Sequence, residues 1–483
     1  SYSGTTTISA GTLNANSTTA IGDGSATNTL VFNGGTLQAG GTLTSPSTRS
    51  VTMTGAGTID ANGNAVSIAG AVDGAGALNL TGNGTVTFGG TVGATTALSS
   101  LTSGASTALI INGGSVRTSG NQTYNGTVSS GGATTLTSTG GGTIAAGNTG
   151  NNFSGDLSFS TGGGASVVNA GALALGGSSV GTLTAQSQSG DLTLNGSIAA
   201  TSTSANAVTL VADAAAVPNA TGTGGNFINN AGAGAITTGA GGAWRIYTGN
   251  PTGTVRGGLV EAGKRYNVDD GSDPLASGNR IYFRMQPTLT LTADNQTKTY
   301  GSANPVFTFS ASGLIDGDTA LTAVSSGPSY AVDGTVSTSG NLTAGTLHNI
   351  TPSAATSNLG YSLGYASGTL TVNKLALTGA AIAASSSTYA SALNPGAVSF
   401  TNINGTDVVT STASVNTSTL STSGKPIVGT YTQTASAITG ADAGNYSFGG
   451  FTTGTANYTI NQLALTGAAI AASSSTYASA VSY

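Results

Sequence analysis

Short apolar strands broken by glycine corners fill the first half of the chain and restrict it to β-structure. Segments such as "TLVFNGGTLQAGGTL" and "ALNLTGNGTVTFGG" carry apolar side chains at every second position, for example Leu78 and Leu80, then Val86 and Phe88. A period of two places these side chains on one face of a strand. Asn-Gly and Asp-Gly pairs between the strands accept the positive φ of tight corners. Glycine and β-branched residues in every window disfavour helices.

Strand length distinguishes two all-β architectures for residues 1–243. Very short strands with a corner every few residues favour a β-solenoid, in which each coil stacks its strands on the coil below. An ordinary β-sandwich is the alternative, but it uses longer strands and fewer turns. We therefore expect a solenoid of about ten to twelve coils, with roughly 20–25 residues in each coil.

The composition argues against nucleic-acid binding, disulfide bonds and a membrane-spanning helix. Only 6% of residues are charged and the net charge is −5, while 38% are hydrophobic. This balance favours a folded chain, and it offers no basic stripe that could bind the phosphates of nucleic acid. No cysteine is present, so disulfides do not hold the fold. No run of 18 apolar residues predicts a membrane-spanning helix, and no signal peptide opens the chain, which we interpret as a mature or excised piece.

Residue types that commonly carry out catalysis are sparse. The chain has one histidine, His348, and one glutamate, Glu261, and only six aspartates precede Trp244. A Ser-His-Asp site would lack its nucleophile elbow, zinc would lack a ligand set, and a polysaccharide-cleaving solenoid would need clustered carboxylates. We therefore expect no enzyme and no cofactor, with a polysaccharide-active β-helix enzyme as a remote alternative.

Bulky aromatic and charged side chains gather in a junction at 244–286. Six arginine and lysine residues fall within forty positions here, beside the single tryptophan of the chain. The last coil of a solenoid exposes an unpaired strand edge, which large side chains can cover. We predict that Trp244, Tyr247, Tyr282 and Phe283 cap the solenoid. A binding site with tryptophan and arginine anchors is the alternative.

The junction also contains "DDGSD", in which three carboxylates lie close together in the sequence. Oxygen atoms of carboxylates are ligands that calcium prefers, so Asp269, Asp270 and Asp273 are candidates for a calcium loop. The stretch lacks the glutamate found at the twelfth position of an EF-hand. We predict no other metal site.

A stretch of 18 residues, "LALTGAAIAASSSTYASA", begins at Leu375 and again at Leu463, 88 residues later. Strands lengthen and aromatic residues recur from about position 287 onward, as in small β-sandwiches. We therefore predict β-sandwich repeats at 287–374 (the first repeat) and 375–462 (the second repeat). The start of a truncated third repeat is expected at 463–483.

The duplicated stretch should form the first strand of each repeat, with Leu375 and Leu377 in one copy and Leu463 and Leu465 in the other. No glycine or proline linker separates the repeats at "LTVNKLALT" or "YTINQLALT". A join this short restricts bending, so we expect a stiff tandem array.

Three parts of the chain resemble bacterial sequence families. Residues 27–90, with "FNGGTL", "TIDANGN" and "GAGALNLTGNGTVTFGG", resemble the autotransporter-associated repeat of passenger domains. The junction, with "GGAWRIYTGNPTGTVRGGL" and "SGNRIYFRMQPTLTLT", resembles a segment of filamentous-haemagglutinin-like exoproteins. The two repeats resemble the MBG and YDG repeats of the same exoproteins through "KTYGSANPVFTF" with "SGLIDGD" and "GADAGNYSF" with "TINQLALTG". The second repeat has "YASALNP" where the pattern reads "YGxxNP".

The resemblance implies a right-handed parallel β-helix followed by tandem small, Ig-like β-sandwiches. It also implies a non-catalytic adhesin of a Gram-negative bacterium, secreted with the help of an outer-membrane partner and extracellular or held at the cell surface. A stiff rod of this kind would serve attachment or a biofilm matrix, with its host, surface or glycan receptor left open. A self-assembling filament, in which neighbouring copies join by strand donation from the C-terminal segment, is the alternative.

Overall fold

The computed structural model describes residues 1–272 and 277–480. Strands contain 42% of the residues and helices 2%, which confirms the prediction of an all-β chain. The chain divides into two compact units, and each is described by itself. Unit 1 comprises Ser1–Leu289, Gly313–Gly327 and Ala355–Gly364, and unit 2 comprises Thr290–Ser312, Pro328–Ala354 and Tyr365–Tyr483. The domain boundaries drawn from the sequence stay predictions.

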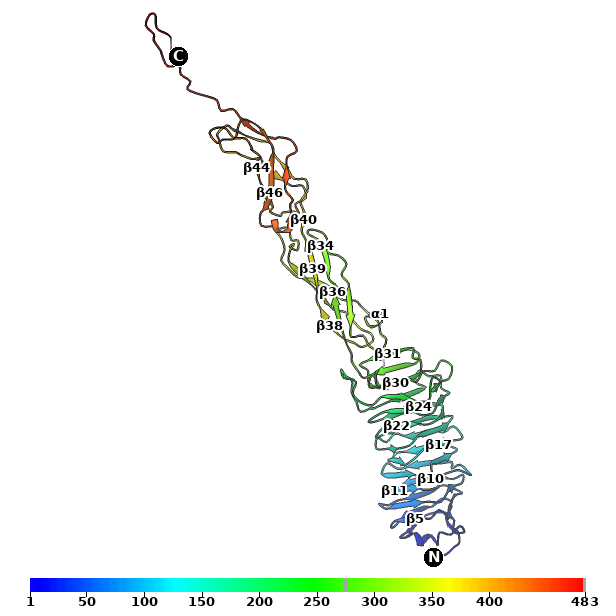
Figure 1. Cartoon of the computed structure of the whole chain (residues 1–483). Helices are drawn as coiled ribbons and strands as arrows, with labels where there is room; N and C mark the ends of the chain where they lie inside the picture. The colour runs from blue at the N-terminus through cyan, green and yellow to red at the C-terminus, as the bar shows by residue number, and fades with distance from the viewer. Residues whose placement is uncertain (273–276, 481–483) are drawn as a thin grey trace. The chain divides into compact units, whose positions relative to one another are not determined.

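Unit 1 is built on parallel sheets through which the chain passes again and again (Figure 1). In its largest sheet, Leu78 pairs with Leu101 of the next pass and Leu101 pairs with Gln122 of the pass after that. In sheet order, the described strands are β2 (Thr12–Ala15), β4 (Thr36–Ala39), β7 (Gly57–Asp60), β10 (Ala77–Thr81), β12 (Ser100–Ser103), β15 (Gln122–Tyr124), β18 (Ile144–Ala146), β21 (Gly164–Asn169), β24 (Thr182–Ser187), β27 (Val208–Val211), β30 (Trp244–Thr248), β32 (Arg280–Phe283) and β31 (Gly263–Tyr266).

Three smaller parallel sheets share the remaining strands described in this unit. The first contains β1 (Thr6–Ile8), β3 (Leu30–Phe32), β6 (Val51–Met53) and β9 (Val72–Asp73). The second contains β5 (Leu43–Ser45), β8 (Ala65–Ile68), β11 (Gly84–Phe88), β13 (Thr107–Ile111), β16 (Val128–Ser130) and β19 (Asn152–Phe153). The third contains β14 (Ser115–Thr118), β17 (Thr134–Ser138), β20 (Leu157–Thr161), β22 (Leu173–Leu175), β23 (Ser178–Val180), β25 (Leu192–Leu194), β26 (Ile198–Ala200), β28 (Phe227–Asn229) and β29 (Ile236–Thr237). A short 3-10 helix, η1, spans Thr18–Ile21.

The core of unit 1 follows the period-two pattern of the sequence. Leu78 and Leu80 of β10 and Val86 and Phe88 of β11 are fully buried, as predicted, and the residues between them are partly exposed. Parallel pairing places each inward side chain above its counterpart in the preceding pass, for example Phe88 beside Ile68. Burial of these stacked apolar side chains is the main source of stability that the strands share.

Corners between passes come so close that only glycine fits at some of them. A β-carbon on Gly70 would lie 1.9 Å from the carbonyl oxygen of Arg49 in the preceding pass. Gly74 has φ of 120°, a conformation that other residues rarely adopt, and its β-carbon would lie 2.3 Å from the carbonyl oxygen of Met53. The abundance of glycine therefore reflects close stacking of backbone on backbone.

The first repeat contributes residues to both units. Its elements are β33 (Thr288–Ala293), β34 (Gln296–Thr299), β35 (Phe309–Ser312), α1 (Ala320–Ala323), β36 (Ser329–Val332), β37 (Leu347–Ser353), β38 (Ser362–Ala366) and β39 (Gly368–Asn373). In unit 2, β34 pairs with β39 in parallel, and β37 pairs with β39 and β36 antiparallel. β33 and β35 form an antiparallel pair.

The second repeat lies wholly in unit 2. Its elements are β40 (Leu375–Ala376), β41 (Ala381–Ile382), β42 (Ser385–Thr388), β43 (Val398–Ser399), β44 (Thr410–Val415), β45 (Gly429–Tyr431), β46 (Gln433–Thr439), η2 (Ala443–Asn445), β47 (Tyr446–Ser447), β48 (Phe451–Thr452) and β49 (Tyr458–Asn461). β42 pairs with β49 in parallel, the same relation that β34 has to β39. In both repeats, a strand near the start therefore pairs in parallel with the last strand.

The two copies of the duplicated stretch differ in structure. The first copy contains β40, β41 and β42, whereas residues 462–480 contain neither strand nor helix. Leu463 and Leu465, which were expected in a strand, are 52% and 91% exposed. The first copy forms strands because it has partners: β40, β41 and β42 bond to β47, β43 and β49, which all follow the first copy in the chain. Among the described residues, no helix is long and apolar enough to cross a membrane.

Candidate functional site

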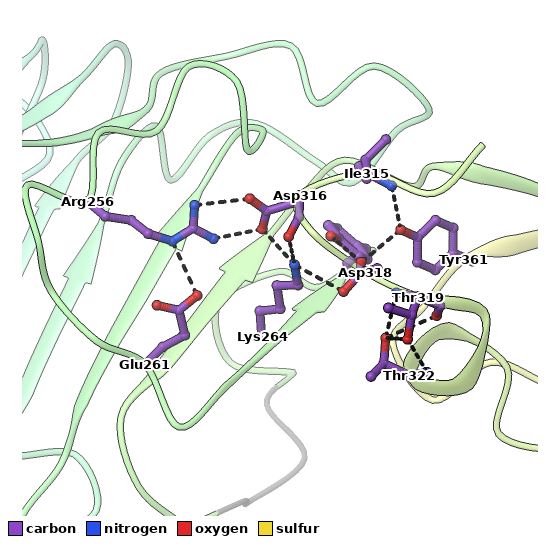
Figure 2. A network of polar contacts seen from close by, with 10 residues as sticks. Arg256, Glu261, Lys264, Ile315, Asp316, Asp318, Thr319, Thr322 and Tyr361 are labelled. Atoms are coloured by element: carbon purple, nitrogen blue, oxygen red, sulfur yellow. Dashed lines mark hydrogen bonds and ion pairs between the residues drawn. The ribbon is translucent and has the colours of Figure 1, made fainter. Parts of the chain in front are cut away.

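A network of polar contacts in unit 1 centres on two aspartates of the "LIDGDT" loop, Asp316 and Asp318 (Figure 2). Arg256 binds Asp316 with two nitrogens, at 3.1 Å and 2.7 Å from the two carboxylate oxygens. The Nζ atom of Lys264 lies 2.8 Å from Oδ2 of Asp316 and 3.0 Å from Oδ1 of Asp318. Glu261 binds the other side of Arg256 at 3.2 Å. Two-point binding by arginine fixes the orientation of a carboxylate as well as its distance.

Two tyrosines complete the network at Asp318. The hydroxyls of Tyr266 and Tyr361 both donate to Oδ2 of Asp318, each at 2.8 Å. The hydroxyl of Tyr361 also accepts the backbone N–H of Ile315 at 3.1 Å, which ties this tyrosine to the loop that carries the carboxylate. The two rings meet edge to face, with centroids 5.1 Å apart and planes at 71°. This arrangement of one aspartate between two tyrosine hydroxyls is called the clasp below.

Local backbone geometry explains why the loop presents both carboxylates. Asp316 and Gly317 have φ of 54° and 76°, so the chain makes a left-handed turn that aspartate and glycine tolerate. Thr319 then caps α1 through a capping box with Thr322 (Figure 2). Asp318 is held between the turn and the cap, and its position is fixed from both sides.

Neighbouring charges and burial shift the pKa values of several groups in the network. Burial would raise the pKa of Asp316, but hydrogen bonds from Arg256 and Lys264 outweigh it and lower the pKa below its usual range. Burial and the hydrogen bond to Asp318 raise the pKa of Tyr361 to about 12. Burial raises the pKa of Tyr266 further, with the same carboxylate adding to it. Asp316 is therefore held as a carboxylate and the two tyrosines as neutral hydroxyls, and these three groups form ion pairs and hydrogen bonds instead of exchanging protons near neutral pH.

A second clasp in unit 2 has the same geometry. Asp407 accepts hydrogen bonds from the hydroxyls of Tyr300, in the first repeat, and Tyr446, in the second repeat, the latter at 2.6 Å. The Tyr446 hydroxyl accepts the backbone N–H of Asn404 at 2.9 Å, as the Tyr361 hydroxyl accepts that of Ile315. The rings of Tyr300 and Tyr446 are 5.3 Å apart at 69°. The join between the two repeats is therefore held by a buried carboxylate.

Further contacts at this join surround the clasp. The backbone N–H of Ser339 donates to Oδ1 of Asp407 at 3.0 Å, and that of Thr338 donates to Oδ1 of Asp442 at 3.1 Å. The N–H of Ala344 donates to the side chain of Asn445 at 2.8 Å. Three backbone donors of the first repeat thus bond to polar side chains of the second repeat, and these bonds fix the direction in which the second repeat docks.

An apolar cluster lies beside the second clasp. Its buried members come from both repeats: Ala293, Tyr300, Ile350, Leu370, Val372, Val409 and Tyr446. Leu375 and Leu377 at the start of the second repeat pack against this cluster. Burial decides their role, because a leucine removed from water contributes about 1.5–3 kcal/mol. In the first copy, the start of the duplicated stretch therefore packs at the join between the two repeats.

The aromatic residues predicted to cap the solenoid are buried in unit 1. Trp244 is 2% exposed, and Tyr247 and Tyr282 stack with their ring centroids 5.0 Å apart. Phe283 is fully buried and stacks on Tyr266 of the first clasp at 5.5 Å. A cavity of about 430 Å³ next to Tyr247 is lined by Gln186, Asn206, Thr209, Val211, Asp270 and Gly271. Capping stays a prediction for these residues.

The predicted calcium ligands lie beside an arginine. The Nε atom of Arg284, whose side chain is fully buried, is 3.1 Å from Oδ1 of Asp269, and its NH2 group is 3.7 Å from Oδ1 of Asp270. Asp273 lies outside the described residues. Within residues 1–272 and 277–480, no group of three or more acidic, histidine or cysteine side chains could hold a metal. Arg284 already supplies positive charge to both described carboxylates.

The clasp residues were not among those predicted from the sequence. The signals that could have found them are the tyrosines of "KRYN" and "KTYG" and the aspartates of "SGLIDGD" and "NINGTD". The two loops differ in length by one residue, and their tyrosine partners lie 52 and 107 residues from the aspartates. A signal of this kind becomes visible only when the segments are placed side by side.

Comparison with known families gives one finding. The family model of the MBG domain (YGX type) matches residues 289–371. The match covers Tyr300, Asp316, Asp318 and Tyr361, so it contains members of both clasps. No curated protein and no solved structure matches the chain.

Proposed function

We propose that this MBG-containing, all-β chain is a non-catalytic structural adhesin of a Gram-negative bacterium, related to filamentous-haemagglutinin-like exoproteins. In this proposal it is secreted with an outer-membrane partner and acts outside the cell in attachment or in a biofilm matrix. The observation that carries the proposal is the join in unit 2, where Asp407 is held by Tyr300 of one repeat and Tyr446 of the next. Such a join resists bending, which suits a protein that holds a surface at a distance.

The strand pairing of unit 1 supports the solenoid part of the proposal. From β2 to β30, each strand of the largest sheet pairs in parallel with a later strand of the same sheet, and the chain returns to this sheet through other sheets. A right-handed parallel β-helix is the fold that we assign to this pattern, with Ig-like sandwiches for the repeats. Such repeating architectures offer extended binding surfaces, which suits adhesion.

The environment of His348 and Glu261 favours a non-catalytic role. His348 is 1% exposed, and its ring nitrogens lie 3.2 Å and 2.9 Å from the carbonyl oxygens of Asp333 and Thr343. Glu261 is engaged by Arg256. A general acid or base must reach a substrate, and both groups are instead used in structural contacts.

Attachment can be tested directly with the purified chain. Beads coated with the chain should adhere to mucin-coated, glycan-coated or uncoated surfaces more than beads coated with a protein of similar net charge, because a displayed adhesin needs no other factor. Attachment equal to the control on all three surfaces would contradict the proposal. Release of reducing sugar ends from a panel of polysaccharides would revive the β-helix enzyme.

A filament is the second candidate, and the exposed C-terminal segment favours it. Leu465 and Ile470 are 91% and 97% exposed, so residues 463–480 could add a strand to a neighbouring copy. Electron microscopy of the concentrated protein should then show uniform fibres that a variant lacking residues 463–483 does not form. Separate particles in both samples would leave the adhesin as the better account.

A further inference from the structure

The far end of the second repeat is built like the end of the first repeat that holds Asp407. Tyr300 directly follows β34, and its backbone N–H donates to the carbonyl oxygen of Asn373 at 2.8 Å. Tyr389 directly follows β42, and its N–H donates to the carbonyl oxygen of Asn461 at 2.8 Å. Because β34–β39 and β42–β49 are equivalent parallel pairs, Tyr389 occupies in the second repeat the place of Tyr300 in the first.

The serines beside the two tyrosines also correspond. In the first repeat, "VSTSGNL" is closed by a bridge between Val336 and Leu342, and in the second "LSTSGKP" is closed by a bridge between Leu420 and Pro426. The hydroxyl of Tyr300 bonds to Ser337 and to Asp407.

At the far end of the second repeat, Tyr389 bonds to serine hydroxyls, whereas Tyr300 at the first join bonds to the carboxylate of Asp407. The hydroxyl of Tyr389 bonds to Ser421 at 2.8 Å and lies 3.2 Å from the hydroxyl of Ser423. Ser423 corresponds to Ser339, whose backbone N–H donates to Asp407. The end of the second repeat therefore carries the donors of a clasp but no aspartate.

An apolar surface lies open at the same end. A cavity of about 430 Å³ is lined by Tyr389, Val428, Gln462, Leu463 and Leu465. Leu463 and Leu465 begin the second copy of the duplicated stretch as Leu375 and Leu377 begin the first, and the latter two pack against the cluster at the first join. That cluster includes Val409 and Tyr446, which belong to the repeat that those leucines begin.

We propose that this end of the second repeat is a docking site for a further copy of the same repeat, joined through residues 463–480. The aspartate equivalent to Asp407 in that copy accepts the hydroxyl of Tyr389, and its own second tyrosine closes a third clasp. The apolar residues of the docked copy cover Leu463 and Leu465. This inference concerns assembly, and it holds whether or not the chain is an adhesin.

The identity of the occupant follows from the duplication and from the state of Asp407. Residues 463–480 repeat 375–392 letter for letter, and Val481, Ser482 and Tyr483 then stand where the second repeat has Leu393, Asn394 and Pro395. The duplication therefore indicates a further repeat that begins in the same way as the second repeat. The second repeat of a separate polypeptide fits less well. Its Asp407 is already held by Tyr300 and Tyr446 and would have to leave its own clasp to reach Tyr389.

The test compares two proteins by hydrogen exchange: the chain as it is (the unextended chain), and the same chain in which residues 393–462 replace residues 481–483 after Ala480 (the extended chain). Docking should protect the amides of Thr422, Ser423 and Val428, since the corresponding N–H groups of Thr338, Ser339 and Ala344 donate across the first join. Tyr389→Phe should raise exchange at these amides about tenfold in the extended chain, the effect of losing one buried hydrogen bond. The change should be smaller in the unextended chain, where the Tyr389 hydroxyl bonds to exposed serine hydroxyls.

Matched variants separate docking from general destabilisation. Tyr330→Phe removes a hydroxyl from a tyrosine that packs on Phe307 within the first repeat, and it should not change exchange at 421–428. Replacing the added copy's counterpart of Asp407 by asparagine should reproduce the effect of Tyr389→Phe. The proposal is overturned by unchanged exchange at 421–428 on extension. It is equally overturned if the amides of the added copy stay unprotected from exchange while those of residues 375–462 are protected. Association of unextended chains through this end would overturn it as well.

Discussion

Removing the carboxylate of Asp407 should loosen the join between the two repeats more than any single change on their surfaces. Asp407 is 9% exposed and accepts hydrogen bonds from two tyrosine hydroxyls and from the N–H of Ser339. Asp407→Ala removes the acceptor of three donors, of which the two tyrosine hydroxyls are buried. At about 1 kcal/mol for each donor, the loss is about 3 kcal/mol, which corresponds to roughly a 150-fold change in an opening equilibrium.

Hydrogen exchange of the full chain measures this loss locally, which is necessary because a chain of several units does not unfold in two states. In Asp407→Ala, amides at 337–345 and 403–409 should exchange up to about 150-fold faster than in the wild type, while amides of unit 1 keep their rates. Asp294→Asn is the matched control, because Asp294 accepts an exposed bond from Thr308 and should change the same amides less than threefold.

The effect of Asp407→Ala should also depend on pH. Burial would raise the pKa of Asp407, but hydrogen bonds from Tyr300 and Tyr446 outweigh it and lower the pKa in the folded state. A lowered pKa means that the carboxylate contributes stability above its unfolded pKa of about 3.9, and that this contribution is lost as the pH falls through the folded pKa. The difference between wild type and variant should therefore be full at pH 7 and shrink below about pH 4. Equal exchange in the two proteins at pH 7 would refute the reasoning.

Other predictions concern both units. Phe88→Asp places an unpaired charge in the core of unit 1 and should cost more than about 4 kcal/mol, seen as faster exchange over residues 75–95; unchanged protection would mean that Phe88 faces outward. Trp244, at 2% exposed, should show blue-shifted fluorescence that iodide quenches weakly, and a red-shifted, readily quenched signal would contradict its burial. Inserting four Gly/Ser residues after Lys374 should leave both repeats folded but broaden the distance distribution from small-angle scattering, whereas an unmodified chain that already scatters as independent beads would disprove a stiff join.

Period-two patterning was sufficient to predict the strands of unit 1 and the side chains that they bury. Leu78 and Phe88 point inward because alternation and tight corners leave a strand one choice of face. The parallel partner of each strand follows from the length of one pass. These features are local in sequence, or repeat at a fixed interval, and so a single sequence reveals them.

The clasps could not be predicted in the same way, because they depend on contacts between distant segments. Tyr266 and Tyr300 are single tyrosines after short strands, and nothing in their neighbourhood indicates a carboxylate partner. The sequence shows the arginine and lysine residues of the junction without indicating their partners, and in the structure Arg256 and Lys264 bind Asp316. The duplicated stretch shows the same limit, since one sequence forms strands at 375–392 and none at 463–480.

The pairing of β42 with β49 has a consequence for the order of folding. Two early strands of the second repeat, β40 and β42, find their partners only near its end, so the repeat closes as a whole and its folding requires contacts of high sequence separation. In unit 1, each new pass pairs with the pass just completed, and structure can grow one strand at a time. A chain that emerges gradually from a ribosome or a pore would thus acquire unit 1 continuously and the second repeat in a single late step.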